Sequence, residues 1–151
     1  MDHDATLQDA CFRVVAECAC EGLRRTARAV TQLYEDALAP SGLRATQFPI
    51  LVALAAAGPL PVTRLADALG LERTTLTRNM RGLQDLGLIA IAGGDDRRTR
   101  VVELTPEGSR CLSEALPLWE QAQGHVEERF GHVRLQGLHG ELSRLTEIVR
   151  S

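Results

Sequence analysis

The chain contains no lysine, and only 3% of its 151 residues are aromatic. Single-stranded nucleic acid binds by stacking bases on aromatic rings, so this scarcity disfavours that class of protein. The longest apolar runs, such as residues 50–57, are far shorter than the roughly 20 residues of a membrane-spanning helix. Met1 is followed by Asp2 and Asp4 rather than by the basic residues that open a signal peptide. We therefore expect a soluble, cytoplasmic protein without membrane association.

Four cysteines are too few for a disulfide scaffold in a chain of this length. Cys18 and Cys20 lack the spacing of a zinc site, and on a continuous helix they would point to opposite faces, unable to share a bond or a metal ion. His125, His132 and His139 recur every seven residues. That spacing separates neighbours by about 10.5 Å along a helix, too far for one ion. We expect reduced thiols, surface histidines, no metal and no cofactor.

The sequence also lacks the motifs of serine hydrolases, zinc proteases, phosphate-binding loops and dinucleotide-binding folds, which disfavours an enzyme. Its charge is unevenly distributed, although the net charge is only -3. The first 21 residues carry five acidic side chains against Arg13, whereas residues 73–100 carry six arginines against three aspartates. Arginine suits phosphate groups and guanine edges, and genomic base composition explains its exclusive use equally well. The placement of the arginines is therefore the stronger indication of an anionic partner.

Hydrophobic periodicity predicts a mainly α-helical chain. A long helix is expected over residues 7–38, and a second begins with Thr46 as its cap and Pro49 in its first turn. Thr105 begins a further helix, with Pro at its first position, and a last helix follows. We assign three aromatic residues to the core, namely Tyr34, Phe48 and Trp119.

The middle of the chain predicts two short helices and a hairpin. The first helix spans residues 62–69 and is closed by Gly70, and the second spans residues 72–86. The spacing of apolar residues then changes from that of a helix to that of a strand. Two strands are predicted, over residues 88–92 and 100–104, and a glycine-rich turn joins them. These parts, in this order, make a winged helix-turn-helix, whose second helix fits a DNA major groove.

The outer face of the second of these helices carries side chains that suit such a groove. Arginine pairs with guanine, and threonine contacts a base edge or a thymine methyl group. Arginines at the hairpin turn suit a minor groove, where narrow tracts concentrate negative potential. The alternative is that these polar side chains contact only solvent and bind no DNA. The candidates are Arg73, Thr74, Thr77, Arg78 and Arg81 on the helix, and Arg97, Arg98 and Arg100 at the hairpin.

Short motifs in this region resemble the multiple-antibiotic-resistance (MarR) regulators over roughly residues 17–130. They are Leu65-Ala66 with Gly70-Leu71, Arg73-Thr74-Thr75-Leu76-Thr77-Arg78, Leu86-Gly87-Leu88-Ile89, Asp96-Arg97-Arg98 and Leu104-Thr105-Pro106-Glu107-Gly108. The resemblance implies that Arg98 enters the minor groove and that Asp96 orients it. It places Thr74, Thr75, Thr77 and Arg78 on the recognition helix. It also implies a homodimer and a small aromatic or phenolic effector.

The terminal helices give an independent reason to expect a dimer. They are too long and too apolar for a winged lobe of about 40 residues to cover, so their apolar faces need a second copy. We predict that residues 1–45 and 105–151 form the dimerisation region and that residues 46–104 form the DNA-binding lobe. A two-fold dimer then reads a pseudo-palindromic double-stranded operator, with half-sites about 10 to 10.5 bp apart.

Cys20 falls, in the same resemblance, where the organic-hydroperoxide-sensing branch of the family keeps its reactive cysteine. Tyr34 matches one tyrosine partner of that thiol, whereas Ala45 replaces the second. Arg24 and Arg25 would favour the reactive thiolate, and nearby acidic residues oppose it. A small buried hydrophobe in a dimer helix is the alternative.

We therefore expect a sequence-specific transcriptional regulator that binds double-stranded DNA, a repressor released by a small molecule or by oxidation. One alternative is a winged helix that binds another protein and no DNA. Another is a thiol-based peroxide sensor that acts through Cys20.

Overall fold

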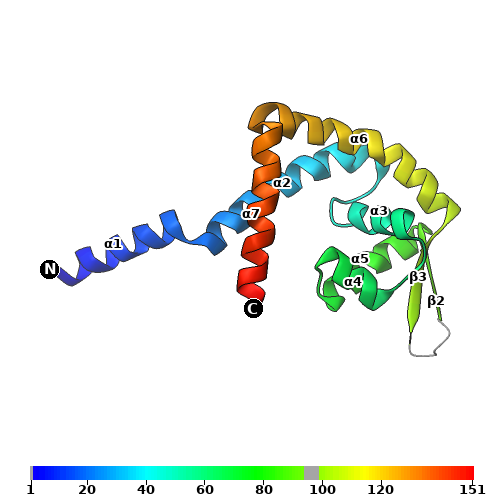
Figure 1. Ribbon diagram of the computed structural model, residues 1–151, viewed down its shortest axis with the longest axis horizontal. Coiled ribbons are helices and arrows are strands. Elements are labelled where there is room, and N and C mark those ends of the chain that lie inside the picture. The colour runs from blue at the N-terminus through cyan, green and yellow to red at the C-terminus, as the bar shows by residue number, and fades with distance from the viewer. Residues whose placement is uncertain (1, 94–98) are drawn as a thin grey trace.

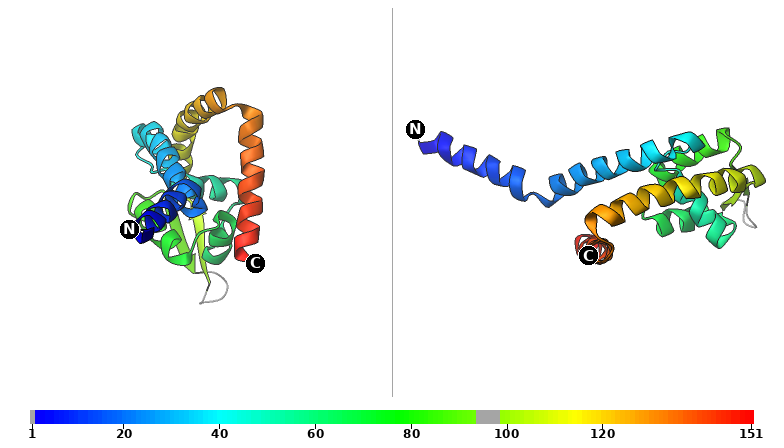
Figure 2. Two further views of the ribbon diagram at one scale, coloured as in Figure 1. Left: turned by 90° about the vertical axis from the view of Figure 1, so that its left-hand side faces the viewer. Right: turned by 90° about the horizontal axis from the view of Figure 1, so that it is seen from above.

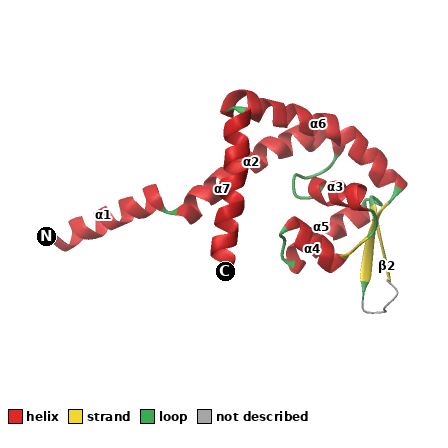
Figure 3. Cartoon of the chain, in the orientation of Figure 1, coloured by secondary structure: helices red, strands yellow, loops and turns green. Residues whose placement is uncertain are grey.

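The computed structural model describes residues 2–93 and 99–151 and is helical apart from one small sheet (Figure 1). Part of the predicted hairpin turn, including Asp96, Arg97 and Arg98, lies outside these residues. The elements follow the order α1 (Asp2–Glu17), α2 (Ala19–Leu38), η1 (Ala39–Ser41), α3 (Phe48–Ala57), β1 (Leu60–Pro61), α4 (Val62–Leu69), α5 (Arg73–Asp85), β2 (Ile89–Gly93), β3 (Arg100–Leu104), α6 (Pro106–Phe130) and α7 (His132–Arg150). The mainly helical winged fold is confirmed, and Figure 3 shows the sheet at one end of the molecule.

The prediction of one long helix over residues 7–38 is wrong, because the chain breaks at Cys18. This residue has an extended backbone, with φ -68° and ψ 109°, and separates α1 from α2. On a continuous helix, the apolar stripe of Leu7, Cys11, Val14 and Cys18 and the stripe that begins at Leu23 would point in directions about 140° apart. The break lets the two helices take different directions, and α1 extends away from the other elements (Figure 2).

The start of α3 also differs from the prediction. Its N-cap is Gln47, and no side chain caps it. A turn precedes the helix, in which the carbonyl of Arg44 accepts the N–H groups of Gln47 and Phe48. Thr46 is therefore no cap, and its hydroxyl donates to Asn79 Oδ1 on α5 at 3.4 Å. Pro49 lies in the first turn, as predicted.

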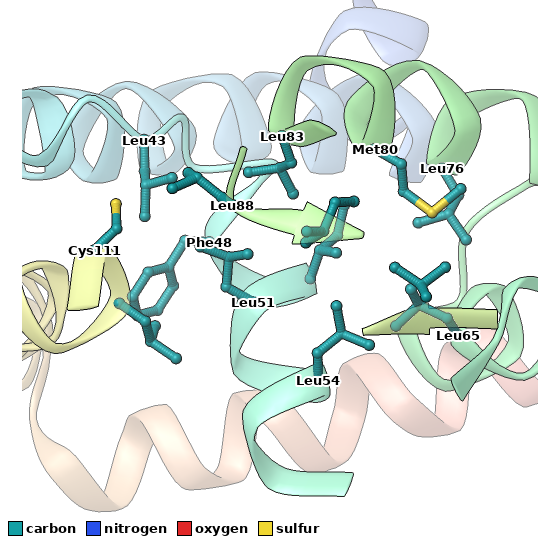
Figure 4. Close-up of a cluster of buried hydrophobic side chains, with 14 of the residues drawn as sticks. Leu43, Phe48, Leu51, Leu54, Leu65, Leu76, Met80, Leu83, Leu88 and Cys111 are labelled. Carbon is teal, nitrogen blue, oxygen red and sulfur yellow. The ribbon is translucent and has the colours of Figure 1, made fainter. Parts of the chain in front are cut away.

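The core of the winged lobe is built from leucine and other aliphatic side chains of several elements (Figure 4). Leu65 of α4 and Leu76, Met80 and Leu83 of α5 are buried, as their helical spacing predicts. They pack with α3 residues such as Leu51 in one cluster. This packing fixes which face of α5 is left for solvent.

The sheet has three strands in the order β1-β3-β2 and is antiparallel throughout. β2 and β3 pair from Ile89 with Leu104 to Gly93 with Arg100, which confirms the predicted hairpin strands. The strand β1 was not predicted, because its two residues are too short to carry a period. β1 lies on the edge of the sheet. Proline has no backbone N–H to donate to a neighbouring strand, and an edge strand tolerates this at Pro61.

The junction between the sheet and α6 is tightly packed. Thr105 is the N-cap predicted for α6, and its hydroxyl oxygen accepts the N–H of Gly108 at 3.0 Å. The same hydroxyl donates to the carbonyl of Gly87 at 2.7 Å. A Cβ on Gly108 would lie 2.0 Å from the carbonyl oxygen of Leu88. These contacts account for the Leu-Thr-x-x-Gly motif, since only glycine lets α6 start this close to β2.

The terminal helices leave large apolar side chains exposed. α6 packs along α2, and α7 contacts α6. None of the described residues of α7 is buried, and Val133 is 80% exposed. Leu7, Phe12 and Val15 of α1 are also exposed. Within the described part of the chain, no helix is both long and apolar enough to cross a membrane.

Candidate nucleic-acid interface

The turn between α4 and α5 sets the angle of the two helices. Gly70 adopts φ 62°, a left-handed conformation that closes α4, and the N–H of Leu71 donates to the carbonyl of Ala66 at 3.0 Å. The chain then enters α5 at Arg73. This is the geometry of a helix-turn-helix, with α5 as its second helix.

The side of α5 that faces away from the core is polar. Five of the residues predicted for DNA contact are exposed there, namely Arg73, Thr74, Thr77, Arg78 and Arg81. Thr75, which only the resemblance assigned, is half-buried beside Leu76. The hydroxyl of Thr77 donates to the carbonyl of Arg73 at 2.7 Å, so its oxygen keeps acceptor capacity toward a partner.

A groove of about 330 Å³ lies between α5 and the sheet. Arg73 and Arg81 of α5 and Arg100 at the start of β3 line it. Three arginines from two elements therefore line one groove. Periodicity indicated the α5 arginines, but it could not indicate that Thr63, Gln84 and Thr99 line the same groove.

The arginines of this surface are available for an external anion. Among residues 2–93 and 99–151, the ion pairs involve Arg28, Arg110 and His132, and none of the arginines of α5 or β3. A guanidinium without an internal carboxylate offers its planar set of donors to phosphate or to guanine. The groove therefore joins arginines of α5 that are unpaired among the described residues to Arg100 at the start of β3.

A second cavity of about 270 Å³ lies between α2, α3 and α6. Its lining residues are Val30, Thr31, Tyr34, Leu38, Ala45, Phe48, Pro49 and Trp119. The rings of Phe48 and Trp119 stack, with centroids 6.3 Å apart. Phe48 is buried, as predicted, whereas Tyr34 and Trp119 are only half-buried and form part of the cavity wall.

Tyr34 supplies the polar edge of this second cavity. Its hydroxyl donates to Gln123 Oε1 at 2.6 Å, and Gln123 Nε2 donates to Glu127 at 2.8 Å. Burial, and then the charge of Glu127, raise the pKa of Tyr34 above its usual value. The phenol therefore stays neutral, and because its proton is donated to Gln123, its oxygen is left to accept a hydrogen bond from a molecule in the cavity.

The cysteines require one correction. Because Cys18 lies outside both helices, the helical argument that Cys18 and Cys20 point to opposite faces fails. Cys20 is exposed in the first turn of α2, whereas Cys111 is buried in the core. Tyr34 is fourteen residues further along α2, about 21 Å from Cys20, so a contact between them within one chain is excluded.

Comparison with known proteins agrees with this geometry. Residues 41–99 match the sequence model of the MarR family. The HTH-type transcriptional regulator YwoH of Bacillus subtilis strain 168 is 28% identical over 92 residues, which are 61% of this chain and 67% of that protein.

Solved structures extend the similarity to most of the chain. The transcriptional regulator MosR of M. tuberculosis, crystallised in complex with DNA, is 38% identical, with a TM-score of 0.80 over 89% of this chain and 100% of that one. A transcriptional regulator from Pseudomonas aeruginosa is 25% identical, with a TM-score of 0.78 over 87% of this chain and 98% of that one.

Proposed function

Because the chain belongs to the MarR family of transcriptional regulators, we propose that two copies of it bind one pseudo-palindromic operator and repress transcription until a small molecule or an oxidant releases the DNA. The chain is a regulator and not an enzyme. Its proposed target is chromosomal DNA, so its proposed location is the cytoplasm.

The convergence of Arg73, Arg81 and Arg100 on one groove is the observation that carries this proposal. α5 enters the major groove with Arg73, Thr74, Thr77, Arg78 and Arg81, and Thr75 contributes from its edge. The wing follows the DNA backbone from Arg100 toward the minor groove. Asp96, Arg97 and Arg98, beyond the described residues, complete that contact, with Asp96 orienting Arg98. The MosR structure in complex with DNA supports the same use of the fold.

The apolar terminal helices support a homodimer. The exposed side chains of α1, α2 and α7, which include Leu7, Leu23 and Val133, need a cover that the described residues do not supply. A second copy buries them by an isologous contact and sets two α5 helices about one turn of DNA apart. Residues 1–45 and 105–151 then form the dimerisation region, and residues 46–104 form the DNA-binding lobe.

The second cavity supports a small aromatic or phenolic effector. A volume of about 270 Å³ suits a molecule with one ring, and the wall combines stacked aromatic rings with one phenol. Because the cavity lies between the terminal helices and the winged lobe, its occupancy changes the separation of the two α5 helices. Oxidation of Cys20 is the alternative signal, since its thiol is exposed on the same terminal helix.

Fluorescence anisotropy with duplex DNA from upstream of the protein's own gene tests the proposal. We expect wild-type protein to bind this DNA above the salt-sensitive background at several salt concentrations. Replacing Arg73 or Arg78 by alanine should cost about 1 to 3 kcal/mol of specific binding. Arg110→Ala is the matched control, because Arg110 is paired with Glu107 and Glu114 on α6.

Equal binding by the Arg73→Ala, Arg78→Ala and Arg110→Ala variants would contradict the assignment of α5. Binding that never exceeds the non-specific background would instead favour a winged helix that binds a protein.

A further inference from the structure

The second cavity and α5 are joined by one short stretch of chain, residues 44–49, here called the linking segment. Ala45, Phe48 and Pro49 of this segment form part of the cavity wall. The two residues between Ala45 and Phe48 both reach α5. Thr46 bonds to Asn79 at 3.4 Å, and Gln47 lies against Gly82.

Gln47 is held in place from several directions. It is the buried polar residue of the core, at 8% exposure. Its Oε1 accepts the N–H of Arg44 at 3.0 Å, and its backbone carbonyl accepts the N–H of Ile50 at 3.1 Å. The carboxamide therefore cannot turn away from α5 without losing the bond to Arg44. A buried polar side chain so fixed acts as a spacer between the segment and the helix.

Gly82 is the residue of α5 that lies against the Gln47 side chain. A Cβ at this position would lie 2.9 Å from Gln47 Nε2, closer than real Cβ contacts. Glycine within a helix costs about 1 kcal/mol relative to alanine. The absence of a side chain at residue 82 thus has a packing reason, which is the close approach of Gln47.

We propose that Gln47 is a positioning residue for α5, and that it transmits displacement of the cavity wall to the DNA-reading helix. The inference rests on the proposed function, since it concerns DNA binding by α5 and the effector cavity. A molecule that displaces Phe48 or Ala45 moves the segment that holds Gln47. Because close-packed interiors transmit such shifts, α5 moves with it.

Operator binding by Gly82→Ala and Gln47→Ala variants tests the spacing. Gly82→Ala should weaken binding about fivefold or more, while the variant stays folded, because the higher helix propensity of alanine offsets part of the steric cost. In the double variant the shorter side chain at residue 47 leaves room for the new methyl group. Its operator affinity should return to within about twofold of that of Gln47→Ala alone. Gly124→Ala on α6 is the control, since its Cβ meets nothing within 4 Å.

Filling the cavity from the opposite wall tests the transmission. Val30 of α2 lines the cavity, and Val30→Phe enlarges its side chain there. We expect Val30→Phe to weaken operator binding about fivefold in the wild-type background, and much less in the Gln47→Ala background. Light scattering on each variant checks that the oligomeric state is unchanged.

Failure of the inference and failure of the proposed function are distinguishable. If wild-type protein does not bind the operator, the proposed function fails, and the inference fails with it. If wild-type protein binds but Gly82→Ala binds equally well, or the double variant does not recover, Gln47 does not position α5. An effect of Val30→Phe that is equal in both backgrounds, or absent from both, overturns the transmission alone.

Discussion

Cys20 combines two features that decide whether a thiol reacts. It is exposed, and it lies in the first turn of α2. Arg24 lies one turn further along the same helix, which places a positive charge near the sulfur. Cys111, by contrast, is a buried residue of α6 whose sulfur lies near the carbonyl of Ser41, and burial raises the pKa of its thiol.

If Cys20 is the redox switch, the Cys20→Ser variant should remain on the operator when cumene hydroperoxide releases the wild-type protein. Anisotropy before and after addition of the oxidant measures this release. Cys111→Ser serves as the control and should respond as the wild type does, because its sulfur is buried. Equal release of DNA by Cys20→Ser and wild type would remove Cys20 from the mechanism.

Single residues were predictable where a local rule decides their place. Helical spacing predicted that Leu76, Met80 and Leu83 are buried, and the turn required a left-handed glycine at Gly70. Gln47 was not predictable, because its burial depends on Gly82, which is 35 positions away in the sequence. The arginines of α5 followed from periodicity, whereas their convergence with Arg100 depends on how the sheet packs beside α5.

The start of α6 is tightly packed against residue 88, and Gly108→Ala should destabilise this junction. The new Cβ would collide with the carbonyl of Leu88, which is backbone and cannot swing aside. We expect a loss of about 1 to 3 kcal/mol in the free energy of unfolding, measured by urea titration. Gly124→Ala, in the same helix but without such a neighbour, should be neutral or stabilising. Equal stabilities of the two variants would show that α6 is free to move away from β2.

Elements were predictable where strong boundary residues flank them. α4 has the predicted bounds, and Thr105 begins α6 as predicted. The break at Cys18 was missed, although the change in phase between the two apolar stripes was present in the sequence. No proline and no side-chain cap marks the break, so the local boundary signals do not reveal it. β1 could not be predicted, since only pairing with β3 makes two residues a strand.

For the molecule as a whole, α7 is the element whose removal tests the dimer. None of the described residues of α7 is buried, so α7 adds nothing to the core. A chain that ends after Phe130 should therefore keep its winged lobe folded. We expect this shortened chain to be monomeric and to bind the operator poorly, because one lobe reads only one half-site. Light scattering and anisotropy measure the two properties, with circular dichroism as the check on folding. A stable dimer of the shortened chain would mean that the interface lies elsewhere.

α6 has a mechanical consequence, because it joins the sheet at one end and α7 at the other (Figure 1). Its 25 residues, with Pro117 among them, form a curved rod about 37 Å long. Tilting such a rod by about 5° moves its far tip by about 3 Å, which is close to the 3.4 Å rise of one base pair. In the proposed dimer, leverage of this kind would let a sub-ångström adjustment near the pivot take one half-site out of register.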